Sequence, residues 1–243
     1  YRESRYYQDG HVINAFFTYD QTFGDHSVAA TLGGNFDDYT GSTLMAQQKG
    51  SLSDNLSFIG LMTNEAGTNN IEKASQSISS YRTLGFFARV NYDYKGKYLV
   101  DFSGRYDGTS RFAPDSRWGS FPSASAGWRI SEEPFFQPAK KAIENLKVRY
   151  SYGNLGNQQM SSYYPYIRTI TPGTQTWIFG TASEATTATI GAPVAQGLTW
   201  ETTEQHNLGV DMAFLNNRVT AALDWYLRDT KDLLAYVPVP AGM

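Results

Sequence analysis

The chain has 243 residues, with 20 basic and 23 acidic side chains that give a formal net charge of -3. This near balance, without a long run of like charge, argues against a nucleic-acid-binding surface. Cysteine is absent, which excludes disulfides, thiolate metal sites and a cysteine nucleophile. No apolar run approaches the roughly 18 residues of a transmembrane helix. No signal peptide opens the chain, so we expect a removed leader or an internal segment.

Aromatic residues make up 15% of the chain and charged residues only 18%. Soluble domains carry nearer about 25% charged residues. A membrane β-barrel fits this composition, because each of its strands needs an apolar residue only at every second position.

Eight stretches alternate apolar and polar residues with a period of two, which predicts eight β-strands. In chain order they cover residues 13–23, 27–36, 84–94, 98–107, 121–130, 146–153, 207–214 and 218–228. Gly24-Asp25, Lys95-Gly96-Lys97 and Asn216-Asn217 predict short turns that close three hairpins.

The other connections are longer. Polar stretches over 37–82 and 154–199 predict long surface loops, and 108–119 predicts a medium one. Ser131, followed by two glutamates, predicts the N-cap of a short helical connector that runs to about residue 146. Apart from this connector, short turns alternate with long loops. Outer-membrane barrels show the same asymmetry, with short turns on the periplasmic side and long loops outside.

The predicted strands separate apolar from charged residues onto opposite faces. When the apolar residues set the register, the charges on the other face are Asp20, Arg89, Asp93, Asp101, Arg105, Arg129, Lys147, Arg149, Asp211, Arg218, Asp224 and Arg228. A charge facing lipid at mid-membrane costs about 2–4 kcal/mol, so this pattern is typical of a membrane barrel. Glu204 and His206 would break the pattern if the membrane-spanning part of the strand over 207–214 began before Leu208.

Several aromatic residues cluster beside the short turns, where a barrel has its inner aromatic belt. They are Tyr19, Phe23, Tyr92, Tyr94, Tyr98 and Phe214. The predicted fold class is therefore all-β, an antiparallel transmembrane β-barrel segment with long extracellular loops.

Three alternatives stay open from the residues alone. The strands of a soluble β-sandwich or propeller also alternate apolar and polar residues, and there the aromatic residues would form the core. A self-contained eight-stranded barrel could serve as an adhesin or structural protein of the outer membrane. A soluble carbohydrate-active enzyme would need paired carboxylates about 5–10 Å apart, and the sequence proposes no such pair.

No residue pattern predicts a catalytic, cofactor or metal site. The three histidines lie far apart in sequence, and neither Asp37-Asp38 nor Asp229 with Asp232 has the spacing of a calcium loop. The candidate contacts for a substrate or partner are the aromatic residues Tyr163, Tyr164, Tyr166 and Trp177. They could stack on sugar rings or pack beneath a partner, although packing within their own loop is the favoured interpretation. The arginines and aspartates of the charged face are expected to form salt bridges, for example to neighbouring strands, rather than to contact substrate.

Seven segments resemble the SusC/RagA-type TonB-dependent transporters of Bacteroidota outer membranes, in the order and spacing of that family. The segments are residues 94–99, 105–114, 117–123, 127–133, 146–153, 156–158 and 198–209. The resemblance implies a barrel of about 22 strands around an N-terminal plug. It also implies an outer-membrane location and the import of glycans or peptides.

The same resemblance implies a SusD-like surface lipoprotein as a lid, energy delivered by TonB through the N-terminal part, and neither enzymatic activity nor a cofactor. We expect residues 1–243 to form a partial barrel domain, about eight strands of the larger wall, without plug, TonB-contacting box or final strand.

Overall fold

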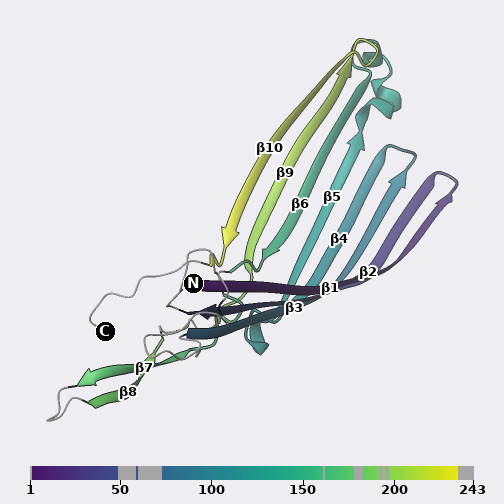
Figure 1. The fold of residues 1–243 in the computed structure, drawn as a ribbon. Helices are drawn as coiled ribbons and strands as arrows, with labels where there is room; N and C mark the ends of the chain where they lie inside the picture. Colours follow the sequence, from purple (N-terminus) through teal and green to yellow (C-terminus); the bar gives the residue numbers. More distant parts are fainter. Residues whose placement is uncertain are drawn as a thin grey trace. The chain divides into compact units, whose positions relative to one another are not determined.

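The structure is a computed structural model that describes residues 2–48, 59, 73–160, 162–177, 183–191, 194 and 197–234. Ten strands are present in this described part (Figure 1). They are β1 (Arg2–Phe23), β2 (His26–Gln47), β3 (Lys73–Tyr94), β4 (Tyr98–Thr109), β5 (Trp118–Arg129), β6 (Asn145–Asn157), β7 (Ile170–Trp177), β8 (Ser183–Ile190), β9 (Glu201–Phe214) and β10 (Val219–Lys231). No helix in the described ranges is long and apolar enough to cross a membrane.

Eight of the strands form one sheet in the order β1-β2-β3-β4-β5-β6-β9-β10, and β7 and β8 form a separate two-stranded sheet. The paired strands from β4 onward run antiparallel. The predicted all-β class and the eight-stranded sheet are therefore confirmed. β1 and β10 stand at opposite ends of this order, so among the described residues the sheet does not close on itself as a self-contained barrel requires.

The chain divides into two compact units, one of residues 1–13 and 36–83 and the other of residues 14–35 and 84–243. In the first unit, the predicted loop over 37–82 is wrong in part, because β2 runs to Gln47 and β3 begins at Lys73. These strand ends carry few apolar residues and so lack the pattern used to predict strands. Their contacts are polar or aromatic: Asp38 accepts a hydrogen bond from Arg82 Nε at 2.8 Å, and the rings of Tyr39 and Tyr81 stack at 5.2 Å.

In the second unit, the predicted loop over 154–199 is also shorter than expected. β6 continues to Asn157, β9 begins at Glu201, and β7 and β8 pair between them with Ile170 opposite Ile190. Threonine and small residues dominate this hairpin, and they alternate too weakly in polarity to predict a strand.

The predicted helical connector consists of three short 3-10 turns, η3 (Ile130–Glu132), η4 (Pro134–Phe136) and η5 (Ala139–Lys141). Ser131 is not an N-cap, since it lies buried inside η3 and its hydroxyl donates to Asn145 Oδ1 at 3.4 Å. Pro134 and Pro138 each lack a backbone N–H, which keeps these turns from joining into one α-helix.

The pairing register confirms that apolar and polar residues occupy opposite faces of the sheet from β4 to β10, because directly opposed residues share a face. One apolar row consists of Tyr98, Trp128, Val148, Val210 and Leu223. The next apolar row on that face consists of Val100, Ala126, Tyr150, Leu208 and Trp225. Between them, on the opposite face, lie Leu99, Gly127, Arg149, Gly209 and Asp224.

Candidate functional site

The apolar face is a band of large exposed side chains. On β10, Leu223 and Trp225 are 64% and 63% exposed. Buried apolar residues are few among the described residues: Phe112, Phe121, Trp200 and Ala213. From Val219 to Leu227 the apolar stretch of β10 covers nine residues, within the roughly 9–11 that a tilted strand needs to cross a bilayer.

The band ends at Glu204 and His206, on the long-loop side. Because β9 begins at Glu201, both residues lie inside the strand, on the same face as Leu208. His206 stands opposite Leu227, and its Nδ1 lies 2.8 Å from the hydroxyl of Tyr150. Glu204 stands opposite Asp229 and accepts from Lys231 Nζ at 2.8 Å. This change from apolar to ionic contacts marks the limit of the band.

At the short turns the band ends in a ladder of neighbouring aromatic rings. Ring centroids are 4.7 Å apart for His26 and Tyr94, 6.2 Å for Tyr94 and Tyr98, and 6.4 Å for Tyr98 and Trp128. Phe135 on η4 extends the ladder, edge-on to Trp128 at 6.4 Å. Amphipathic rings in one row are typical of a membrane interface.

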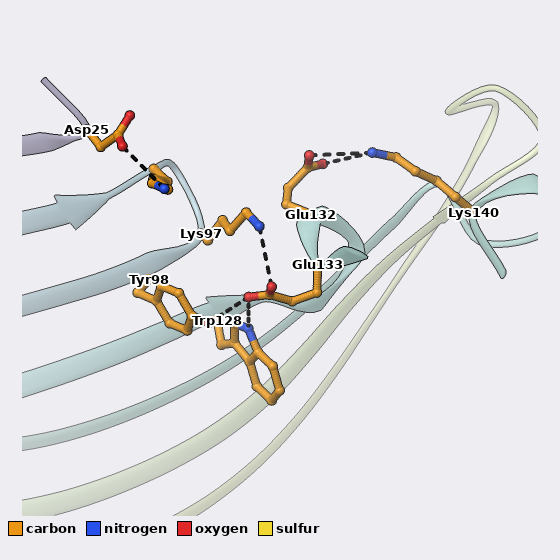
Figure 2. A network of polar contacts seen from close by, with 8 residues as sticks. Asp25, Lys97, Tyr98, Trp128, Glu132, Glu133 and Lys140 are labelled. Atoms are coloured by element: carbon orange, nitrogen blue, oxygen red, sulfur yellow. Dashed lines mark hydrogen bonds and ion pairs between the residues drawn. The ribbon is translucent and has the colours of Figure 1, made fainter. Parts of the chain in front are cut away.

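The carboxylate of Glu133 ties the connector to this ladder (Figure 2). Its Oε1 accepts from the hydroxyl of Tyr98 at 2.7 Å and from Nε1 of Trp128 at 3.2 Å, while Oε2 pairs with Lys97 Nζ at 3.3 Å. The hydrogen bond from Tyr98, followed by that from Trp128 and the charge of Lys97, lowers the pKa of Glu133. An ionised Glu133 therefore fastens the 3-10 turns to β4 and β5.

Two ion pairs flank this contact. Glu132 binds Lys140 at 3.3 Å (Figure 2), and Asp25 binds Lys95 at 3.3 Å. The hydrogen bond to Asp25 raises the pKa of Lys95. The turns at this end are thus held by charges outside the strands.

On the polar face, the side chain of an arginine lies over a glycine of the neighbouring strand and reaches the strand beyond it. Arg149 on β6 pairs with Asp211 on β9 at 3.1 Å and with Asp224 on β10 at 2.7 Å. Gly209 lies directly between them, and a Cβ built on it would stand 2.4 Å from Arg149 Cζ. The missing side chain gives the guanidinium its path across β9.

The same arrangement recurs nearer β2. Arg105 on β4 donates from Nη2 to Asn35 Oδ1 on β2 at 2.9 Å and to Asp107 Oδ1 at 2.8 Å. A Cβ on Gly85 of β3 would lie 2.1 Å from Asp107 Oδ1 and 2.5 Å from Asn35 Oδ1. The polar face is therefore cross-linked by charged side chains that lie flat over glycines.

Between these bridges the polar face has a shallow hollow with a floor of short side chains. The polar-face residues that line it are Ser27, Ala29, Asn91, Asp93, Leu99, Asp101, Ser125, Gly127, Lys147, Arg149, Ser151 and Asn207. Oδ1 of Asn207 is buried there and has no hydrogen-bond partner among the described residues. Arg89 pairs with Asp101 at 2.7 Å, so one wall of the hollow is already neutralised.

A small apolar cluster lies at the opposite end of the strands from the turns. Phe112, Phe121 and Trp200 are buried together, with Met160, Leu198 and Leu234 packed around them. Trp200 Nε1 donates to the carbonyl of Arg117 at 2.9 Å, and Arg117 Nε donates to the carbonyl of Phe112 at 3.1 Å. This cluster fixes the loop between β4 and β5. Sequence reasoning missed it, although Gly119 and Gly156, which make room for the ring of Phe121, were signals of close packing.

The predicted contact residues lie beyond β6. Tyr163 is half-buried and its ring lies under the guanidinium of Arg111, with Cζ 4.9 Å from the centroid. Tyr164 is 39% exposed, and Tyr166 is half-buried. Trp177 is the last residue of β7, and its side chain lies outside the described part of the structure.

An open antiparallel sheet with one exposed apolar face and one ion-paired face defines this chain as wall of a β-barrel. The family described as TonB dependent receptor-like, beta-barrel, matches residues 1–243, and the chain belongs to that family. The resemblance found in the sequence is thereby confirmed.

Individual proteins of the same kind are similar to this chain in sequence and structure. TonB-dependent receptor P26 of Formosa agariphila is 34% identical over 223 residues, which cover 91% of this chain and 22% of the relative. TonB-dependent receptor SusC of Bacteroides thetaiotaomicron is 37% identical over 163 residues, covering 65% of this chain and 16% of SusC. The solved structure of the RagAB peptide transporter superposes with a TM-score of 0.86 at 28% identity, over 98% of this chain and 25% of that one. The chain thus spans about a quarter or less of the length of these relatives.

Proposed function

We propose that this chain is part of the wall of a TonB-dependent outer-membrane transporter that imports glycans or oligopeptides together with a SusD-like surface lipoprotein. The observation that carries the proposal is the register of β4 to β10, which puts exposed apolar rows on one face and ion-paired rows on the other. Membership of the receptor family supplies the link to TonB.

The apolar face contacts lipid and the polar face lines the lumen. With the faces exchanged, the Arg149, Asp211 and Asp224 group would meet hydrocarbon, where charged side chains cost about 2–4 kcal/mol near the midplane. The short turns with the Glu133 contact then lie at the periplasmic rim, and β7, β8 and the Phe112 cluster lie on the extracellular side.

Residues 1–243 supply about eight strands of a barrel of about 22 strands, whose other strands and plug belong to the rest of the receptor. The relatives are several times longer than this chain, which supports the proposal that the other strands and the plug lie elsewhere in the receptor. Transport is accordingly an activity of the whole receptor.

The cargo is a glycan or an oligopeptide. Structural similarity to the RagAB peptide transporter supports a peptide cargo. Tyr163, Tyr164, Tyr166 and Trp177 are the proposed contacts with the cargo or with the lipoprotein lid, because aromatic rings stack on sugars and pack well at interfaces. Of these, Tyr164 is the most accessible of the three described tyrosines.

The test is complementation of a deletion strain with the full-length receptor. Growth and uptake are measured with defined oligosaccharides or defined oligopeptides as the sole nutrient, beside a matched receptor whose TonB contact has been removed. Uptake of one cargo class that needs both the receptor and its TonB contact is the expected result. Uptake unaffected by deletion, or a receptor recovered outside the outer-membrane fraction, contradicts the proposal.

A further inference from the structure

The connector between β5 and β6 leaves the sheet on its apolar side. Glu133 accepts hydrogen bonds from Tyr98 and Trp128, which both belong to an apolar row of the sheet (Figure 2). Phe135 of η4 packs edge-on against Trp128 and is nevertheless 66% exposed. The turns therefore lie over the end of the apolar band rather than over the polar face, and they leave a large apolar ring open to the surroundings.

The connector is held in place along its whole length. Its first half is fixed to β4 and β5 through Glu133. At its far end, the carboxylate of Glu144 accepts the backbone N–H of Asn217, in the turn between β9 and β10, at 2.6 Å. Lys140 of η5 pairs with Glu132 of η3 at 3.3 Å, which joins the last turn to the first. Because these contacts fix the connector, its exposed ring is presented at a constant height relative to the strands.

One lysine of the connector has no partner. The other lysines of the connector and of the turn between β3 and β4 are paired, namely Lys95 with Asp25, Lys97 with Glu133 and Lys140 with Glu132. Lys141, the last residue of η5, is exposed and makes neither an ion pair nor a hydrogen bond with the described residues. The connector thus combines an exposed aromatic ring with an uncompensated positive charge.

We propose that η3–η5 form a binding site for a phospholipid of the periplasmic leaflet, with Phe135 among the acyl chains and Lys141 at the headgroup phosphate. Through Trp128 the ring continues the band assigned to lipid, so the inference rests on the proposed function. Charge complementarity identifies the phosphate, the anionic group that phospholipids share.

The dimensions of a bilayer fit this site. The headgroup region of one leaflet is about 5–7 Å thick, and a lysine reaches across such a distance with its stem on apolar surface and its ammonium in the polar layer. A ring and an ammonium on one short connector therefore contact both sides of that layer. Because the site lies on a connection rather than on a strand, it adds a headgroup contact to the aromatic row of the sheet.

The first experiment measures the depth of the connector in the membrane. The full-length receptor, freed of any other cysteine, carries a fluorophore on Phe135→Cys or on Gln137→Cys, in vesicles of phosphatidylethanolamine and phosphatidylglycerol. Gln137 is the matched control, because it is exposed on the same connector but polar. Lipid with brominated acyl chains should quench the fluorophore at position 135 severalfold more than at position 137. Iodide in the water should act in the reverse order.

The second experiment measures headgroup binding. Retention of spin-labelled phosphatidylglycerol by the detergent-solubilised receptor is compared for wild type, Lys141→Gln and Arg129→Gln. Arg129 is an exposed cation at the same end of the strands, but the register places it on the polar face. Lys141→Gln should lower the affinity about fivefold, which is typical of one lysine at an anionic lipid surface. Arg129→Gln should leave the affinity unchanged.

Several results would overturn the proposal. They are equal quenching at positions 135 and 137, unchanged lipid affinity of Lys141→Gln, and an equal loss of affinity in Lys141→Gln and Arg129→Gln. Shielding of position 135 from both quenchers would show that another part of the receptor covers Phe135, which also overturns it. A fluorophore on Trp225→Cys separates this site from the proposed function. Quenching by lipid at position 225 but not at 135 overturns the site alone, whereas quenching at neither position overturns the lipid-facing assignment of the apolar band.

Discussion

Arg149 on β6 reaches Asp224 on β10 by lying across the strand between them, with 2.7 Å separating Nη2 from Oδ1. The contact depends on Gly209, because a side chain there would occupy the place of the guanidinium. Three strands are thereby joined through one side chain. Such a link opposes sliding of one strand along the next, because a change of register would separate Arg149 from its two carboxylates.

Gly209→Ala should disrupt this link. The new Cβ would lie 2.4 Å from Arg149 Cζ, so Arg149 must move, and overpacking of this kind costs about 1–3 kcal/mol. Urea unfolding of the receptor in lipid vesicles measures the loss. Gly104→Ala on β4 is the matched control, since nothing lies within 4 Å of its built Cβ. Equal stability of the two variants would show that the crossing contributes nothing.

The Glu133 contact predicts a pH dependence. Hydrogen bonds from Tyr98 and Trp128 and the charge of Lys97 lower the pKa of Glu133 below its ordinary value of 4.5. Stability from this group is therefore present above about pH 4.5 and is lost as the pH falls through the lowered pKa. Glu133→Gln should lower the thermal midpoint at pH 7, and its difference from wild type should shrink as the pH falls below about 4.5. A difference that is constant with pH would rule out the ionised contact.

The sequence predicted the strands whose two faces differ most. On β10 the alternation of Leu223, Asp224 and Trp225 was enough to assign each residue to its face, and the register confirms it. The outer parts of β2 and β3 could not be predicted this way. A strand segment without a continuous apolar face is held by backbone pairing and a few contacts such as the Tyr39–Tyr81 stack.

For the polar hollow and the ion pairs beside it, the sequence predicted which residues share the charged face but not which of them contact one another. The sequence placed Arg149, Asp211 and Asp224 on the charged face, and the structure adds that they form one group. Their meeting depends on β6 pairing with β9 although β7 and β8 lie between them in the chain. The two strands are far apart in the sequence, and the local alternation of apolar and polar residues does not indicate that they pair.

Neighbouring residues of β10 test the assignment of the faces. Trp225 and Tyr226 are 63% and 65% exposed, but they point to opposite faces of the sheet, so they differ in environment rather than in accessibility. The chain has no cysteine of its own. In the full receptor freed of any other cysteine, a fluorophore on Trp225→Cys should be quenched strongly by spin-labelled lipid, and one on Tyr226→Cys weakly. Equal quenching at both positions, or the reverse order, would refute the lipid-facing assignment.

Trp200 should be the most sensitive position of the loop cluster. It is 6% exposed, and it packs edge-on against Phe121 at 5.2 Å while donating to the carbonyl of Arg117. Trp200→Ala should cost about 3–5 kcal/mol, measured by urea unfolding of the receptor in vesicles. Trp200→Phe keeps an aromatic ring and loses the hydrogen bond, so about 0.5–1.5 kcal/mol is expected. Proteolysis between β4 and β5 should accelerate in the same order, and equal rates in both variants would mean that Trp200 does not hold this loop.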